Sequence, residues 1–258
     1  MKNKIKQIAQ LVYESKYAVV MTGAGMSVES GIPPFRGTTG IWTRYGKPKL
    51  DSFSDFKKNP TKWWDDRRNL TIDKHIIELR ESLTKAKPHD GHHSLARIEK
   101  AEYIKSIITQ NIDGLDLMAG SKKVIEIHGN RKRLRCLDCN NRIDLEEYIP
   151  IYAPDPCEFC GGTVKFDTVL FGEPIPKDIM KSSRNEIDKS DLIIAVGTSA
   201  TVRPASGLLW IAKSQGAKII EVNIEKTKLT AISDYYIKSK AKSFFVSLED
   251  ELATNSNH

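Results

Sequence analysis

The sequence has no apolar run long enough to cross a membrane, so a spanning helix is not expected. Its first ten residues are basic and amphipathic, and they lack the apolar core and the small-residue cleavage site of a secretory signal. We therefore expect a cytoplasmic protein. Cysteine is also scarce, with four among 258 residues. Because the cytosol keeps thiols reduced, these cysteines are not expected to form disulfides.

Neither sign of charge dominates the chain, since 40 Lys and Arg residues face 33 Asp and Glu residues for a net charge of +7. A basic surface attracts polyanions. The lysines, however, are spread along the whole chain instead of being gathered in one block. Nucleic acid is therefore not expected as the direct ligand.

What the sequence does contain is an alternation of short apolar runs with helical patterns. The apolar runs are typical of buried strands and cover residues 17–21, 105–109, 124–127, 191–196 and 218–222. Strands that alternate with helices indicate a parallel sheet with helices on both faces, so we predict an α/β fold with a Rossmann-like sheet. The first strand passes into Gly23-Ala24-Gly25 and the start of a helix, an order typical of a nucleotide-binding unit.

Two segments interrupt this alternation. Residues 38–85 are charge-rich and hold three of the four tryptophans, and they predict a helical insertion. Residues 131–164 hold the cysteines in a basic, loop-rich setting. We predict that the two insertions together form a smaller domain. The Rossmann-like domain then comprises residues 1–37, 86–130 and 165–258.

Polar side chains follow several of the predicted strands at the points where the strands end. They are Gln110, Asn111, Asp113, His128, Thr198, Ser199 and Asn223. In an open parallel sheet, ligands bind outside the carboxyl ends of the strands, so these side chains are expected to converge on one cleft. A lone histidine is usually structural, but in such a cleft His128 becomes a candidate general base.

The glycine turn is weak evidence by itself, because a tight strand-to-helix turn can exist without a ligand. The usual dinucleotide fingerprint has a third glycine, and this chain has Val28 at that position. A dehydrogenase that transfers hydride to or from a nicotinamide cofactor is therefore not strongly indicated.

The cysteines form the pattern C-x2-C-x17-C-x2-C, with the members Cys136, Cys139, Cys157 and Cys160. Four thiolates at this spacing make a closed tetrahedral shell with no open position for water, so we predict one structural Zn²⁺. Four reduced core cysteines are the alternative. A zinc ribbon can also bind nucleic acid, and the basic residues from Arg131 to Arg135 leave that reading open.

Taken in order, the motifs resemble the sirtuin family over about residues 15–248. They are GAGMSVESGIPPFRG (23–37), TQNIDGL (109–115), EIHG (126–129), the two cysteine pairs, VLFGE (169–173), GTSATVRPA (197–205) and VNIE (222–225). The resemblance implies an NAD-dependent protein-lysine deacylase, most simply a deacetylase. NAD is then a consumed co-substrate that meets an acylated-lysine peptide in the cleft between the two domains.

The resemblance also implies roles for individual residues. The catalytic residues are His128, as general base, and Asn111. The expected NAD contacts are Gly23, Ala24, Gly25, Ser27, Phe35, Arg36, Gln110, Asn111, Ile112, Asp113, Gly197, Thr198, Ser199, Asn223, Ile224 and Ala241. The expected substrate contacts are Val169, Phe171, Gly172, Trp64 and Arg67.

In the mechanism that the resemblance implies, the acyl oxygen attacks the anomeric carbon of the ribose as nicotinamide leaves. His128 then removes a proton from a ribose hydroxyl. The products are free lysine, nicotinamide and O-acyl-ADP-ribose. Mono-ADP-ribosyl transfer uses the same cleavage of NAD and stays an alternative, although a base at His128 serves the deacylation step.

Three positions depart from the family pattern, namely Pro34 for an aspartate, Asp116 for a histidine and Phe166 for a proline. In family members that remove acidic acyl groups, a tyrosine and an arginine lie three residues apart, where this chain has Trp64 and Arg67. Arg67 can pair with a carboxylate, or Trp64 can wall an apolar acyl pocket. Deacetylation is favoured, with longer or acidic acyl groups as the alternative.

Overall fold

The large sheet has six parallel strands. In this computed structural model, which describes residues 2–47, 50–145 and 153–255, they lie in the order β3-β2-β1-β7-β8-β9. Their bounds are β1 (Ala18–Thr22), β2 (Ser106–Thr109), β3 (Val124–Glu126), β7 (Leu192–Val196), β8 (Lys218–Asn223) and β9 (Tyr235–Lys238). The order changes direction at β1, which pairs with β2 on one side and β7 on the other. A crevice at such a switch point is where ligands bind in open α/β sheets.

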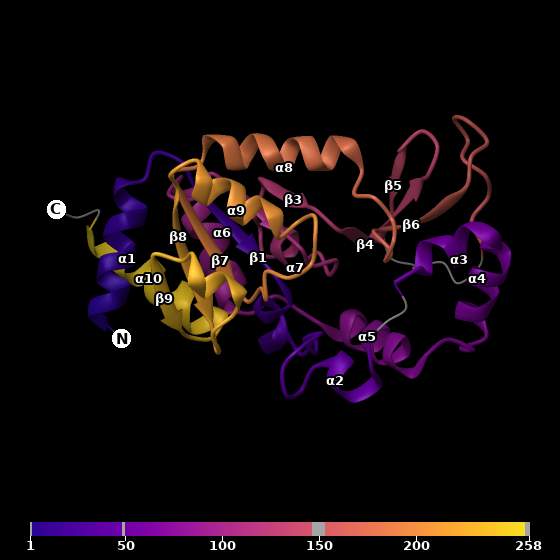
Figure 1. The fold of residues 1–258 in the computed structure, drawn as a ribbon, viewed down its shortest axis with the longest axis horizontal. Coiled ribbons are helices and arrows are strands. Elements are labelled where there is room, and N and C mark those ends of the chain that lie inside the picture. Colours follow the sequence, from indigo (N-terminus) through magenta and orange to yellow (C-terminus); the bar gives the residue numbers. More distant parts are fainter. Residues whose placement is uncertain (1, 48–49, 146–152, 256–258) are drawn as a thin grey trace.

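Helices cover both faces of this sheet, as the alternation of elements predicts (Figure 1). One face packs against α1 (Lys2–Glu14), α6 (Asp90–Lys100) and α10 (Ala241–Asn255). The other packs against α8 (Lys177–Lys189) and α9 (Gly207–Ser214). β1 and β7 are buried along their whole length, which explains why these runs are apolar at every position. Across the described residues, no helix is long and apolar enough to cross a membrane.

The helix expected after the glycine turn is the main difference from the sequence prediction. Two 3-10 turns, η1 (Ala24–Met26) and η2 (Val28–Ser30), take its place. They end at Gly31, which has a φ of +88°, and the chain then enters Pro33-Pro34. A left-handed glycine and two prolines cannot continue a helix. The backbone N–H groups at the cleft therefore come from tight turns and not from a long helix.

Between η2 and α6 the chain forms four short helices, so this insertion is helical as expected. They are α2 (Ile41–Tyr45), α3 (Ser52–Lys58), α4 (Pro60–Arg68) and α5 (Lys74–Lys85). Two smaller elements complete the described helices of the large domain, namely α7 (Leu115–Met118) and η3 (Lys228–Ala231).

A second, antiparallel sheet lies away from the large one and has the order β5-β4-β6 (Figure 1). Its strands are β4 (Gly129–Cys136), β5 (Arg142–Asp144) and β6 (Val164–Thr168), so it reaches slightly beyond the predicted insertion 131–164. Trp64 of α4 packs in one apolar cluster with Leu134, Cys136 and Val164. The helical and cysteine-bearing insertions therefore share a core.

Candidate active site

The glycine turn after β1 lies directly against the turn after β7. The N–H of Gly25 donates to the carbonyl oxygen of Gly197 at 2.8 Å. A Cβ atom on Gly25 would lie 2.5 Å from Cα of Gly197, and one on Gly23 would lie 2.9 Å from Thr198. Only glycine allows this approach of two backbones. Two of the predicted cofactor segments are thus brought together by the parallel pairing of β1 with β7.

A buried hydrogen-bond network joins the glycine turn to the segment after β2. The side-chain amide of Asn111 donates to the carbonyl oxygen of Gly23 and to the hydroxyl of Ser27, both at 3.0 Å. The Ser27 hydroxyl in turn donates to a carboxylate oxygen of Asp113 at 2.7 Å. Burial raises the pKa of Asp113, while its hydrogen bonds to the N–H of Leu115 and to Ser27 oppose that shift. These bonds fix three predicted cofactor residues in one orientation.

Gln110 and Asn223 tie the remaining strand ends to Thr198. The amide of Gln110 donates to the Thr198 hydroxyl at 2.9 Å, and the amide of Asn223 donates to the Thr198 carbonyl oxygen at 3.2 Å. Below Asn111, the hydroxyls of Thr22 and Thr109 are 2.8 Å apart, and Thr109 also accepts from the N–H of Asn111. The ends of β1, β2, β7 and β8 therefore meet in one place, as the sequence predicts.

His128 follows β3 at the same edge of the sheet. Its Nδ1 lies 2.9 Å from the carbonyl oxygen of Gln110. Because a carbonyl oxygen can only accept, Nδ1 carries the proton and Nε2 keeps a free lone pair. Burial lowers the pKa of His128, and the bond to Gln110 partly opposes that effect. The imidazole is therefore neutral at pH 7 with a basic nitrogen available.

The predicted cofactor loop, which carries Phe35 and Arg36, reaches the site through Arg36. Arg36 Nη1 donates to the hydroxyl of Ser199 at 2.8 Å, so the loop reaches the segment after β7. Ile112, on the other side, accepts the backbone N–H of Arg131 at 3.0 Å and links the segment after β2 to β4.

The predicted substrate segment, residues 169–172, starts next to His128. The N–H of Val169 donates to the carbonyl oxygen of His128 at 2.9 Å. At its other end, the buried carboxylate of Glu173 contacts Arg135 and lies 3.1 Å from Nζ of Lys165. Glu173 also accepts the N–H of Leu170 at 2.9 Å. The segment is thus held between the candidate base and the small sheet.

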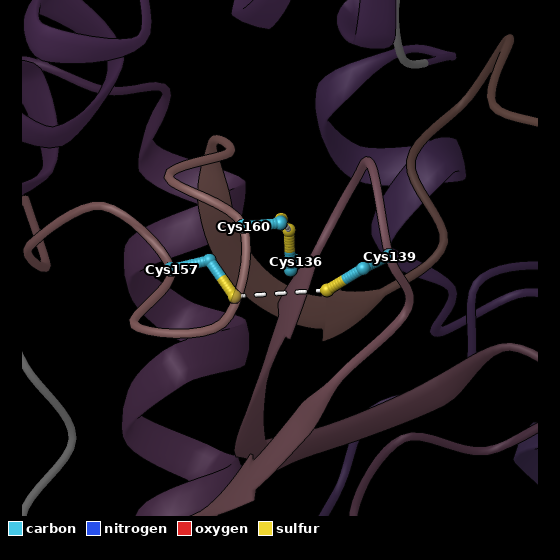
Figure 2. A group of neighbouring side chains, drawn as sticks. All are labelled: Cys136, Cys139, Cys157 and Cys160. Atoms are coloured by element: carbon cyan, nitrogen blue, oxygen red, sulfur yellow. Dashed lines mark hydrogen bonds between the residues drawn. The ribbon is translucent and has the colours of Figure 1, made fainter.

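The four cysteines form a compact cluster at the far end of the small sheet (Figure 2). All four sulfur atoms lie within 4.8 Å of one another, with 3.5 Å from Cys136 to Cys160 and 3.6 Å from Cys139 to Cys157. A tetrahedral zinc with Zn–S bonds of about 2.3 Å places its sulfurs about 3.8 Å apart. The cluster fits one zinc ion with four thiolate ligands and no open coordination position.

Comparison with known proteins agrees with this arrangement. Residues 23–204 match the sequence profile of the Sir2 family. The chain is also 39% identical over 236 residues to the NAD-dependent protein deacylase 1 of Archaeoglobus fulgidus, covering 92% of this chain and 93% of that protein. The chain belongs to the Sir2 family. This sirtuin is also 37% identical over 256 residues to the NAD-dependent protein deacetylase of Sulfurisphaera tokodaii, covering 98% and 97% of the two chains.

Solved sirtuin structures have the same fold. A Sir2 homolog in complex with NAD superposes with a TM-score of 0.80 at 37% identity, covering 97% of this chain and 94% of that one. A Sir2 complex with a p53 peptide and NAD superposes with a TM-score of 0.77 at 30% identity, covering 97% and 99%.

Four predicted site residues of the sirtuin have positions of other kinds. The backbone N–H of Ile224 donates to the side-chain oxygen of Asn223 at 2.9 Å, but the residue is 61% exposed. Ala241 is buried in the core at the start of α10. Trp64 is only 1% exposed and stacks with Phe166 at 4.7 Å between ring centroids. The Trp64 ring therefore forms part of the core that the two insertions share. Arg67 stacks on the ring of Trp63 and donates to the Trp63 carbonyl oxygen at 3.1 Å.

Three residues of the sirtuin site were missed by sequence reasoning. Thr109 supports Asn111, Glu173 anchors the substrate segment, and Trp42 packs beside the cofactor loop. Thr109 and Glu173 belong to the motifs TQNIDGL and VLFGE, so the sequence could have indicated both residues. Trp42 lies in an insertion whose pairing with the site only the structure reveals.

Asp116, where the family often has histidine, is buried at the start of α7. Burial raises the pKa of Asp116 to about 7, and the nearby carboxylate of Asp113 adds to the shift. Glu126 and Glu99 contribute in the same direction. This sirtuin therefore holds a group of acidic side chains below the segment that carries Asn111 and Asp113.

Proposed function

We propose that this sirtuin removes acyl groups, acetyl in the first place, from protein lysine side chains and consumes NAD in doing so. One observation carries the proposal: a single stretch, residues 110–113, contacts both the glycine turn and the candidate base. Asn111 bonds to Gly23, and the carbonyl oxygen of Gln110 holds the ring of His128. A dinucleotide on the glycine turn therefore lies within reach of the imidazole.

The residues present fit a dinucleotide. Glycines at positions 23, 25 and 197 let the turns after β1 and β7 pack backbone against backbone, since an added Cβ atom at any of them would meet the facing turn. Closely packed glycine turns at the ends of parallel strands are typical of sites that bind a pyrophosphate. When bound, NAD supplies a ribose carbon from which nicotinamide departs. Asn111, Ser27 and Asp113, already fixed by their mutual bonds, are the residues that orient the nicotinamide half.

His128 is suited to act as the general base. Its Nδ1–H donates a hydrogen bond to the carbonyl oxygen of Gln110, and burial lowers its pKa. Nε2 is therefore unprotonated at neutral pH and can accept a proton. The bond to a backbone carbonyl also fixes the ring orientation. Holding reactants in line matters most where the nucleophile is a weak amide oxygen.

The acylated peptide is placed along residues 169–172, which begin at the backbone of His128. In support, a solved sirtuin complex contains a p53 peptide together with NAD. The acyl preference follows from the helical insertion. Arg67 is engaged by Trp63, and Trp64 is a core residue, so neither presents a free group to an acidic acyl chain. A small neutral acyl group is favoured.

The test is to incubate the protein with NAD and acetyl-, propionyl-, myristoyl- and succinyl-lysine peptides, and to measure nicotinamide and free lysine. We expect nicotinamide release that requires a peptide, with the acetyl peptide most active. Release of nicotinamide without free lysine would instead indicate ADP-ribosyl transfer. A preference for the succinyl peptide that is lost in Arg67→Ala would overturn the assignment of acyl class.

A further inference from the structure

Trp42 lies between the two halves of the site. It belongs to α2, in the helical insertion, and is half-buried. Its ring contacts side chains of both the cofactor loop and the substrate segment. No other tryptophan among the described residues contacts both.

On the cofactor side, Trp42 holds both loop residues that the family motif contributes. The rings of Phe35 and Trp42 have centroids 5.5 Å apart, and the guanidinium carbon of Arg36 lies 4.7 Å from the Trp42 centroid. Both values are within the ranges of about 4.5–7 Å for aromatic pairs and about 6 Å for cation–π contacts. The backbone N–H of Trp42 also donates to the carbonyl oxygen of Phe35 at 2.9 Å.

On the substrate side, Trp42 meets Phe171, with centroids 6.0 Å apart. Phe171 lies in the middle of residues 169–172, and its carbonyl oxygen accepts the N–H of Phe53 at 3.0 Å. Gly172 packs so closely on the chain before α3 that an added Cβ atom would lie 3.0 Å from the Leu50 carbonyl oxygen. The substrate segment is therefore fixed to the same insertion that carries Trp42.

We infer that Trp42 is a positioning residue that couples the two substrate sites, because its ring transmits the placement of Phe171 to Phe35 and Arg36. The inference rests on the proposed function for the identity of the two ligands. A peptide that pairs with residues 169–172 fixes Phe171, and Phe171 in turn fixes the Trp42 ring, which Phe35 and Arg36 also contact. Each ligand then binds more tightly when the other is present, as reciprocal coupling requires.

The contacts distinguish this role from that of a core filler. Trp64 is 1% exposed and lies in the small-domain core. Trp42 is only half-buried, and the two loop residues that its ring contacts, Phe35 and Arg36, are both exposed, Phe35 by 37%. A loop that is open to solvent relies on few contacts for its position. The Trp42 ring supplies a contact to each of its two functional side chains, so its removal should change the coupling between ligands more than the stability of the fold.

The experiment measures binding of a carbocyclic NAD analogue that resists cleavage, by calorimetry, without and with saturating acetyl-lysine peptide. In the wild type we expect the peptide to tighten binding about ten-fold, which is a usual strength for coupled sites. In Trp42→Ala this ratio should fall below about two-fold, and in Trp42→Phe it should lie between the two. Trp210→Ala, on the 39%-exposed tryptophan of α9, is the matched control and should keep the wild-type ratio.

A wild-type ratio in a folded Trp42→Ala protein, judged by its melting temperature and zinc content, would overturn the inference, as would the absence of coupling in the wild type. If Trp42→Ala does not fold, Trp42→Leu takes its place, since it fills space without a ring. Peptide-dependent nicotinamide release by the wild type is measured separately. That release tests the proposed function, so failure of the coupling alone leaves the proposed function intact.

Discussion

The imidazole of His128 donates from Nδ1 to the carbonyl oxygen of Gln110 across 2.9 Å, and Gln110 itself reaches Thr198 through its side chain. The candidate base is therefore oriented by the same segment that closes the cofactor cleft. Burial lowers the pKa of His128 below its ordinary 6.5. The basic form thus persists to a pH below that of an exposed histidine.

For catalysis, this relationship predicts a pH profile. A general base works in its unprotonated form, so a lowered pKa moves the acidic limb of kcat/KM downward, to below about pH 6.5, and leaves activity flat near pH 7. His128→Ala should lower kcat by about 10²–10⁴-fold and remove the acidic limb. Steady-state kinetics of both proteins between pH 5 and 8 give the answer, and a variant that keeps most of its turnover would refute the role of His128.

The contact between Gly25 and Gly197 predicts a sharp effect of a single methyl group. A Cβ atom at position 25 would lie 2.5 Å from Cα of Gly197, where only backbone could move aside. Gly25→Ala should weaken ADP-ribose binding at least about ten-fold and destabilise the fold by about 1–3 kcal/mol. Calorimetry and thermal unfolding measure the two effects. Gly207→Ala is the control, since nothing lies within 4 Å of the added atom and the site is at the start of α9.

Zinc removal should affect stability more than chemistry. We expect one zinc per chain by metal analysis and its loss in Cys136→Ser. Because Cys136 and Trp64 belong to one apolar cluster, loss of the metal should expose that core and make the small domain sensitive to proteases. Cys136→Ser with full zinc content and wild-type protease resistance would contradict the assignment.

Asp116 predicts a pH dependence of stability. Its pKa is raised from 3.8 to about 7 in the folded chain, so the folded state holds its proton more tightly than the unfolded state. The folded chain therefore binds more protons between these values, and this contribution to stability is full below about pH 4 and lost as pH rises to about 7. Asp116→Asn, which has no charge to bury, should be more stable than the wild type at pH 8 by about 1–3 kcal/mol.

Chemical unfolding at pH 5 and pH 8 measures this difference. The exposed Asp250 of α10 provides the control, and Asp250→Asn should follow the wild type at both pH values. If Asp116→Asn is destabilised equally at the two pH values, the carboxyl group stabilises the fold through hydrogen bonds, and the buried charge does not lower the free energy of unfolding.

Much of this protein follows from local sequence. β1 and β7 are buried throughout, so their apolar runs could be read as strands without a structure. The cysteine spacing likewise predicts the ligand set, because each of the two pairs can supply two of the four thiolates that coordinate a tetrahedral ion. The sequence also predicts that the polar residues at strand ends share one cleft, because parallel strands bring their carboxyl ends to the same edge.

Other features depend on distances that no local pattern contains. The turns after Gly23 are 3-10 because a left-handed glycine and two prolines stop the helix early. Trp64, next to Trp63 in sequence, turned out to be a core residue, and Trp42 became the contact between two loops. The sequence by itself determined five of the six strands of the large sheet, the cysteine set that fits zinc and the convergence on one cleft, since periodicity and spacing are local, but it did not indicate β9. Only tertiary packing decided which side chains of the insertions face the core and which face the site, because a short helix can rotate about its axis without any change in its sequence pattern.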